Sequence, residues 1–191
     1  MTSRTKPAAL LAVALATFAG VGLSSAGPFR GRVLDAKTRQ PVSGVVVTFV
    51  WVRQVWLPDG TKSDDQFHKA FEAITDAQGR WMLPNAADQL ANPDVELESP
   101  ALVFFKPGYV HWGDKTENGN DLFRDPTITL MKRRTELTEQ EQRDVSGDDP
   151  AWQLATDPIV PVSAIPLLVK ALNEERRRQG LPSLQDTKRG R

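Results

Sequence analysis

Hydrophobic and polar residues alternate with a period of two through much of the chain. The alternation starts at 29–35, returns at 67–75 and closes at 126–132. Because successive side chains of a β-strand point to opposite faces, it predicts strands with one buried face. Residues 45–52 are instead apolar almost without interruption and rich in β-branched and aromatic side chains. They predict a central strand with both faces covered.

A sharply defined turn is predicted at 75–79, TDAQG, before the short strand 80–83. Asp76 can accept hydrogen bonds from nearby backbone N–H groups, and Gly79 can take the positive φ that other residues resist. Thr75 precedes them as the last residue of the alternating run. We therefore interpret 75–79 as the turn of a β-hairpin, and these three residues as structural rather than catalytic.

A second structural turn is predicted at Pro107 and Gly108, directly after the apolar run 101–105. Six or seven predicted strands thus follow one another at regular spacing, with no convincing helix between them. This pattern is typical of a small β-sandwich.

After the last predicted strand the pattern changes. Residues 135–143 predict a short polar helix capped by Thr135. A proline-punctuated linker then leads to an amphipathic helix at 163–179, which Ser163 can cap. Its apolar face, which includes Leu168, must pack against the sandwich, a second copy or a partner, and the sequence leaves all three open.

The N-terminal stretch has the composition of a secretory signal peptide. Arg4 and Lys6 precede an apolar run at 8–23, and small residues follow up to Ala26. We expect cleavage after Ala26, with an uncleaved membrane anchor as the alternative. No other segment of the sequence is long and apolar enough to cross a bilayer, so no membrane span is expected after cleavage.

Composition narrows the classes of function. Lys and Arg together number 24, as do Asp and Glu, so the chain lacks the basic excess of a general nucleic-acid binder. It has no cysteine, which excludes disulfides, thiol catalysis and thiolate metal sites. The predicted parts are a signal peptide at 1–26, a sandwich at 27–132, and a linker with the C-terminal helix at 133–191.

Three segments in this order resemble the carboxypeptidase regulatory-like domain: GRVLDAKTRQPVSG at 31–44, TDAQGRW at 75–81 and KPGY at 106–109. The resemblance implies an all-β fold, a seven-stranded transthyretin-like Greek-key β-sandwich, here with a C-terminal α-helical extension. The family is found in exported bacterial proteins, so a periplasmic or extracellular location is also implied. Its domain is generally a non-catalytic module with roles in folding, interaction or sugar binding.

An enzymatic alternative rests on two histidines. His68 and His111 lie near polar loops with acidic residues and are weak candidates for ligands of a divalent metal. The related intradiol dioxygenases bind iron with two Tyr and two His, whereas Tyr109 is the only tyrosine in this chain. We therefore expect no catalytic residue and no cofactor, and keep a small metal-dependent envelope enzyme as the alternative.

Aromatic residues beside the predicted loops are candidates for ligand binding. Trp56 and Trp112 each precede a polar loop, and Tyr109 lies close to Trp112. Exposed aromatic side chains stack on sugar rings or enter pockets of a partner. The sequence thus predicts an exported, non-catalytic binding or accessory module for a glycan or protein of the cell envelope. A structural subunit of an envelope assembly, held by helix 163–179, is a further alternative.

Overall fold

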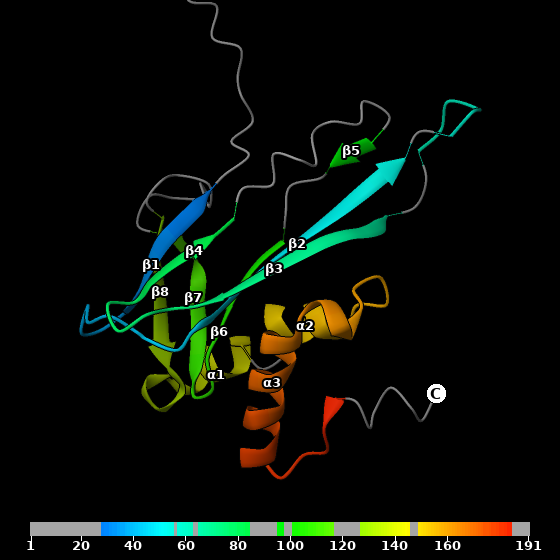
Figure 1. Ribbon diagram of the computed structural model, residues 1–191. Helices are drawn as coiled ribbons and strands as arrows, with labels where there is room; N and C mark the ends of the chain where they lie inside the picture. Colours follow the sequence, from blue (N-terminus) through cyan, green and yellow to red (C-terminus); the bar gives the residue numbers. More distant parts are fainter. Residues whose placement is uncertain are drawn as a thin grey trace, which may run out of the picture.

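A computed structural model describes much of the chain after residue 27. The described residues are 28–55, 57–62, 65–84, 95–97, 101–116, 127–145 and 149–184. They form two β-sheets and a group of short helices, which lie one upon another as three layers (Figure 1). The predicted signal peptide, residues 1–26, lies outside this part of the chain.

The first sheet has the strand order β4-β1-β8-β7. Its strands are β1 (Phe29–Asp35), β4 (Arg80–Leu83), β7 (Tyr109–Thr116) and β8 (Thr127–Arg133). β1 runs parallel to β8, whereas the pairs β1–β4 and β7–β8 are antiparallel. Buried and exposed residues alternate along β1, with Val33 in the core and Arg32 facing outward, as the sequence pattern predicts.

The second sheet is built around the ten-residue strand β2 (Val46–Val55). The other strands are β3 (Gln66–Ile74), β5 (Val95–Leu97) and β6 (Ala101–Phe105). β3 pairs with one edge of β2, and β5 and β6 pair with different parts of the other edge. Val46 and Val50 pack toward the helices. Val47 and Phe49 pack toward the first sheet, which confirms the prediction of a central strand covered on both faces.

Among the described residues, seven strands have four residues or more and β5 has three. The fold is therefore mostly β and sandwich-like, with a few short helices. β5 lies within the connection 84–100, where the alternation of Val95, Glu96 and Leu97 is too short, among prolines and acidic residues, to predict a strand.

The segment 75–79 is a corner between the two sheets, so the prediction of a hairpin is wrong. β3, before the corner, pairs with β2, whereas β4, after it, pairs with β1. Thr75 fixes the corner to the start of β2. Its hydroxyl donates to the carbonyl oxygen of Val42 at 2.8 Å and accepts from the N–H of Val45 at 2.9 Å. The local pattern predicted the turn, but it could not tell which sheet the following strand would join.

Gly79 has the positive φ that the sequence predicts, at 71°. The backbone here lies close to β1, and the N–H of Val33 donates to the carbonyl oxygen of Gly79 at 2.8 Å. A Cβ added at Gly79 would overlap the Val33 carbonyl oxygen. Both the conformation and the close approach therefore require glycine.

We expect Gly79→Ala to destabilise the fold more than Gly44→Ala, the matched control. The two glycines have φ of 71° and 70°, but a Cβ at Gly44 would meet no atom within 4 Å. Gly44→Ala should thus cost about 1–2 kcal/mol for the left-handed backbone alone, and Gly79→Ala should add the overlap to that cost. Urea denaturation of both variants measures the difference, and equal free energies of unfolding would contradict this prediction.

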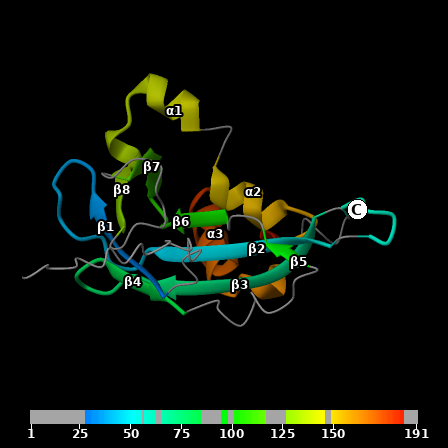
Figure 2. The same ribbon diagram turned by 90° about the horizontal axis from the view of Figure 1, so that it is seen from above.

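In the described part of the chain, three short α-helices and two 3-10 helices, Arg134–Glu136 and Val162–Ala164, follow β8, and α2 and α3 lie against the second sheet (Figure 2). The α-helices are α1 (Glu139–Val145), α2 (Pro150–Thr156) and α3 (Pro166–Arg178). The predicted polar helix is present as α1, but Thr138 precedes it rather than Thr135. The Thr138 hydroxyl accepts from the N–H of Glu141 at 3.3 Å, and the Glu141 carboxylate accepts from the N–H of Thr138 at 2.8 Å. This capping box makes the prediction of Thr135 as the cap wrong.

Helix α2 was not predicted from the sequence. Asp149 caps it by accepting a hydrogen bond from the N–H of Ala151 at 3.0 Å. It has three buried residues, two of which are alanines: Ala151, Leu154 and Ala155. Such a short apolar face gives too little helical periodicity for detection in the sequence.

Helix α3 packs on the sandwich of its own chain. Its buried residues Leu168 and Leu172 belong to one hydrophobic cluster with Val50 of β2 and Phe105 of β6. The sequence left open whether this face packs on the sandwich, a second copy or a partner. In the structure it packs on the sandwich.

The N-terminus of α3 is capped from the sandwich and not by Ser163, so that prediction is wrong. Its N-cap residue, Ile165, makes no side-chain cap. Instead the N–H groups of Leu167 and Leu168 donate to the carboxylate of Glu72 on β3, each at 2.8 Å. A carboxylate at this position satisfies unpaired helical N–H groups and interacts favourably with the helix dipole.

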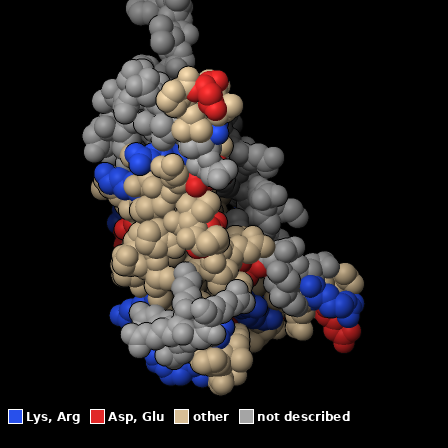
Figure 3. All heavy atoms as spheres, turned by 90° about the vertical axis from the view of Figure 1, so that its right-hand side faces the viewer, with Lys and Arg blue, Asp and Glu red and all other residues tan. Residues whose placement is uncertain are grey.

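The C-terminal part of α3 is also tied to the sandwich. Its Glu175 accepts a hydrogen bond at 3.2 Å from the N–H of Gly108, in the predicted turn at Pro107 and Gly108 between β6 and β7. Glu175 also lies 3.7 Å from Arg134 Nε. The helix ends with three arginines, and Figure 3 shows Lys and Arg gathered at the lower end of the molecule, the level at which α3 ends.

Glu72→Gln should destabilise the protein by about 1–2 kcal/mol, since the amide loses the charge and one of the two acceptor oxygens that cap α3. Glu174→Gln is the control, because Glu174 lies on α3 itself and pairs with Arg178 at the surface. It should cost less than about 0.5 kcal/mol. Chemical denaturation compares the two, and equal effects would show that the Glu72 contact adds no stability.

Candidate functional site

A groove of about 580 Å³ opens on the outer face of the first sheet, where β1, β4 and the end of β3 meet. We call it the outer groove. Its walls include Arg30, Arg32, Ile74, Arg80, Met82 and Ile128.

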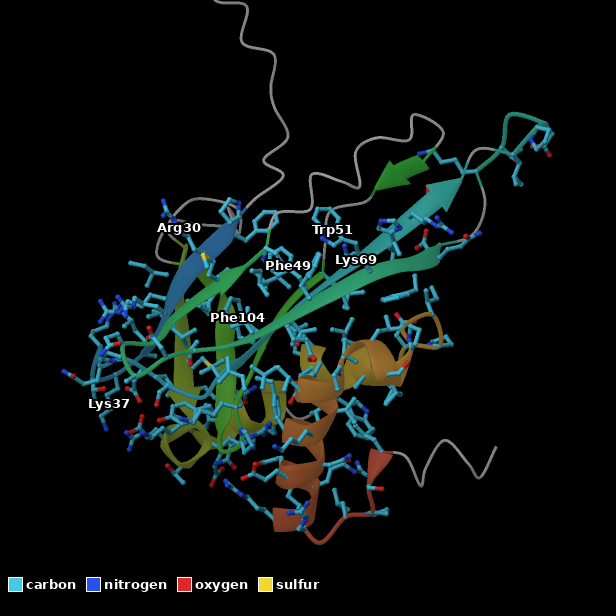
Figure 4. All side chains as sticks on the ribbon, in the orientation of Figure 1. Arg30, Lys37, Phe49, Trp51, Lys69 and Phe104 are labelled. Atoms are coloured by element: carbon cyan, nitrogen blue, oxygen red, sulfur yellow. The ribbon has the colours of Figure 1, made fainter. Side chains whose placement is uncertain are left out.

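Strand register brings these residues together. β4 pairs with β1 so that Met82 lies opposite Arg30 and Arg80 lies opposite Arg32. On the other side of β1, the parallel strand β8 places Ile128 opposite Arg32. Figure 4 shows Arg30 at the outer side of the sheet, away from the labelled core residues Phe49 and Phe104. The alternation that buries one face of these strands therefore assembles the groove on the other face.

The floor of the outer groove is aliphatic. Met82 is 67% exposed and Ile74 is 53% exposed, which is unusual for large apolar side chains of a sheet. Ile128 is half-buried beside them. Exposed apolar side chains that gather in one groove are typical of a binding surface.

The described residues that line the outer groove carry a net positive charge. Three arginines and one aspartate, Asp76, line it. Hydrogen bonds hold the pKa of Asp76 below its usual range, first from the N–H of Arg80 and further from the Arg80 side chain and the N–H of Gln78. Asp76 therefore stays ionised and holds Arg80 Nε at 2.9 Å. Arg32 Nε donates to the carbonyl oxygen of Gln78 at 2.8 Å, so the corner at 75–79 positions two of the three arginines.

Trp81 also lines the outer groove, although its side chain is only 4% exposed. Its ring packs between the sheets, 5.7 Å from that of Phe104 between centroids. Its buried Nε1–H has no hydrogen-bond acceptor among the described residues. Trp81 therefore belongs mainly to the core and presents little of its surface to the groove.

Of the three aromatic residues predicted to bind ligand, Tyr109 is described with its side chain and does not line the outer groove. The Tyr109 ring lies 5.3 Å from Lys106 Nζ, and its hydroxyl accepts from Arg133 Nε at 3.2 Å. Burial, and secondly the charge of Arg133, lower the pKa of Lys106. Trp56 lies outside the described residues, and for Trp112 only the backbone in β7 is described. A ligand role for these residues stays a prediction.

The two histidines lie on strands of different sheets. His68 lies on β3 at a bulge, where Trp51 pairs with Lys69 and Val52 pairs with Phe67. His111 pairs with Met131 in the first sheet. In the described part of the chain, no three His, Asp or Glu residues gather as a metal site would need.

Sequence reasoning missed the outer groove. The alternation of Arg30 and Arg32 along β1 marks an outward face, as do Arg80 and Met82 along β4. The sequence pattern does not indicate that β1 and β4 are neighbours. Their pairing brings these side chains into one groove.

Comparison with protein-family models, curated proteins and solved structures finds no match for this chain. No described helix is long and apolar enough to cross a membrane. The outer groove is therefore interpreted from its own geometry.

Asp76→Asn should lower stability at neutral pH and matter less in acid. Because folding lowers the pKa of Asp76 from its usual 3.8, the ionised group contributes stability above that pH. This contribution is lost as the pH falls through the lower pKa of the folded state. Urea midpoints of wild type and variant should therefore converge below about pH 4. A difference that stays constant from neutral to acidic pH would contradict this assignment.

Proposed function

We propose that the protein is an exported, non-catalytic binding module and that the outer groove is its binding site. The observation that carries this proposal is the groove itself, where exposed aliphatic side chains lie beside three arginines. A volume of about 580 Å³ is within the range of small-molecule sites, which combine an apolar lining with a few polar groups.

In this proposal the sandwich is a carboxypeptidase regulatory-like domain with transthyretin-like topology. Support comes from the ordered motifs at 31–44, 75–81 and 106–109 and from the two packed sheets. The signal-peptide composition of residues 1–26 supports export to the periplasm or beyond the cell.

The non-catalytic assignment is supported by the structural use of the carboxylates. Asp35 accepts hydrogen bonds from the N–H groups of Lys37 and Thr38 at 3.1 and 2.9 Å. Glu72 caps α3, and Asp76 holds the corner between the sheets. Each of these acids satisfies backbone donors, which is a structural use of the carboxylate.

The structural-subunit alternative loses its main support. It relied on an apolar helix face seeking a partner, and the face of α3 is filled by β2 and β6 of the same chain. Of the polar loops beside the candidate aromatic residues, most of the one after Trp56 is described, whereas residues 117–126 after Trp112 lie outside the described part of the chain. The outer groove thus becomes the leading binding surface.

A ligand screen on the full chain tests the proposal. Neutral and acidic oligosaccharides, acidic peptides and anionic amphiphiles are each tested for a rise in the thermal unfolding temperature. We expect at least one class to stabilise the wild type and to have no such effect on Met82→Asp. The Met82 side chain is 67% exposed, so this substitution replaces apolar surface of the groove by a charge without disturbing the core.

Leu57→Asp is the matched control, because Leu57 is a 42% exposed apolar residue that does not line the groove. It should respond to ligand as the wild type does. If no class stabilises the wild type, or if Met82→Asp responds equally, the outer groove is not a binding site.

A further inference from the structure

We propose that the ligand of the outer groove is a single-chain anionic amphiphile, an aliphatic chain that ends in a carboxylate or phosphate. This inference rests on the proposed function and names the ligand class. The groove places aliphatic side chains, which can bind a hydrocarbon chain, beside guanidinium groups, which can bind an anionic head group.

The aliphatic half would accept the hydrocarbon chain. Met82 and Ile74 already expose most of their side chains to water, at 67% and 53%. An aliphatic chain laid over them and over Ile128 removes apolar surface from water on both partners, which favours binding with every methylene covered. Met adapts its unbranched side chain to ligands of varied shape.

The cationic half would bind the head group. Arg32 and Arg80 lie directly opposite each other on paired strands, a placement in which like charges repel. Asp76 pairs with Arg80, whereas Arg32 donates to the neutral carbonyl oxygen of Gln78 and has no ion-pair partner among the described residues. An anion between these side chains relieves the repulsion, and the planar guanidinium matches both carboxylate and phosphate with paired hydrogen bonds.

Other ligand classes fit these walls less well. Sugar rings stack on exposed aromatic faces, whereas Trp81, the aromatic residue lining the groove, is 4% exposed. A neutral lipid would supply no counter-charge to Arg32, which pairs with no described carboxylate. A folded protein partner buries about 800 Å² per side, much more than one small groove offers.

Isothermal titration of the full chain tests the amphiphile below its critical micelle concentration. The four probes are dodecanoate, dodecyl phosphate, dodecan-1-ol and butanoate. We expect one or both of the long anions to bind, and dodecan-1-ol and butanoate to bind at least about tenfold more weakly, since each lacks one half of the chemistry. The comparison of dodecanoate with dodecyl phosphate identifies the head group.

Two groove variants locate the site. Met82→Asp should weaken binding of the long anions at least about tenfold. Arg32→Gln should lower the ratio of the affinity for dodecanoate to that for dodecan-1-ol. Leu57→Asp should bind as the wild type does. These comparisons also remove any contribution of the apolar stretch at 8–23, which all variants share.

Equal affinity for dodecan-1-ol and the anions, or equal affinity of wild type and Met82→Asp, would overturn the amphiphile assignment. If an acidic peptide or oligosaccharide binds at Met82 while neither long anion does, this inference fails and the binding module stands. If no probe distinguishes the wild type from Met82→Asp, both the inference and the proposed function fail.

Discussion

The carboxylate of Glu72 joins the helical layer to the sandwich. It lies on β3 and accepts the N–H groups at the start of α3, almost a hundred residues later in the chain. That contact fixes where the helix begins, and Glu175 fixes its other end at the turn before β7. Between these points α3 covers Val46 and Val50 of β2. Without the helix, this face of the central strand would be exposed to water. The cap therefore sets where α3 lies over the hydrophobic cluster that it shares with β2 and β6.

The position of the helices decides which face of the sandwich remains open. With α2 and α3 on the second sheet, the outer face of the first sheet is left to Arg30, Arg32 and Met82 where β1 and β4 meet. Residues 46–50 of β2 are buried on both faces, whereas the outward positions of β1 and β4 place Arg30, Arg32, Arg80 and Met82 at the surface. An open face of this composition favours a ligand with both charged and apolar parts.

The corner at 75–79 serves the fold and the groove together. Thr75 ties it to the start of β2, and Gly79 lets the chain pass close to β1. Asp76 then holds Arg80 by the same hydrogen bonds that shape the turn. A residue read from the sequence as purely structural therefore also orients a side chain of the proposed site.

The sequence by itself determined the strands, the turn at Gly79 and the amphipathic C-terminal helix, because each depends on periodicity or on one residue's backbone preference. Only the tertiary structure decided that β3 and β4 belong to different sheets, that Glu72 caps α3 in place of Ser163, and that Arg32 meets Arg80 and Ile128. Alternation tells which face of a strand is buried, but not which strand lies beside it. The outer groove is formed by side chains of paired strands that are distant in the sequence. Its position therefore follows from strand pairing and not from the local pattern.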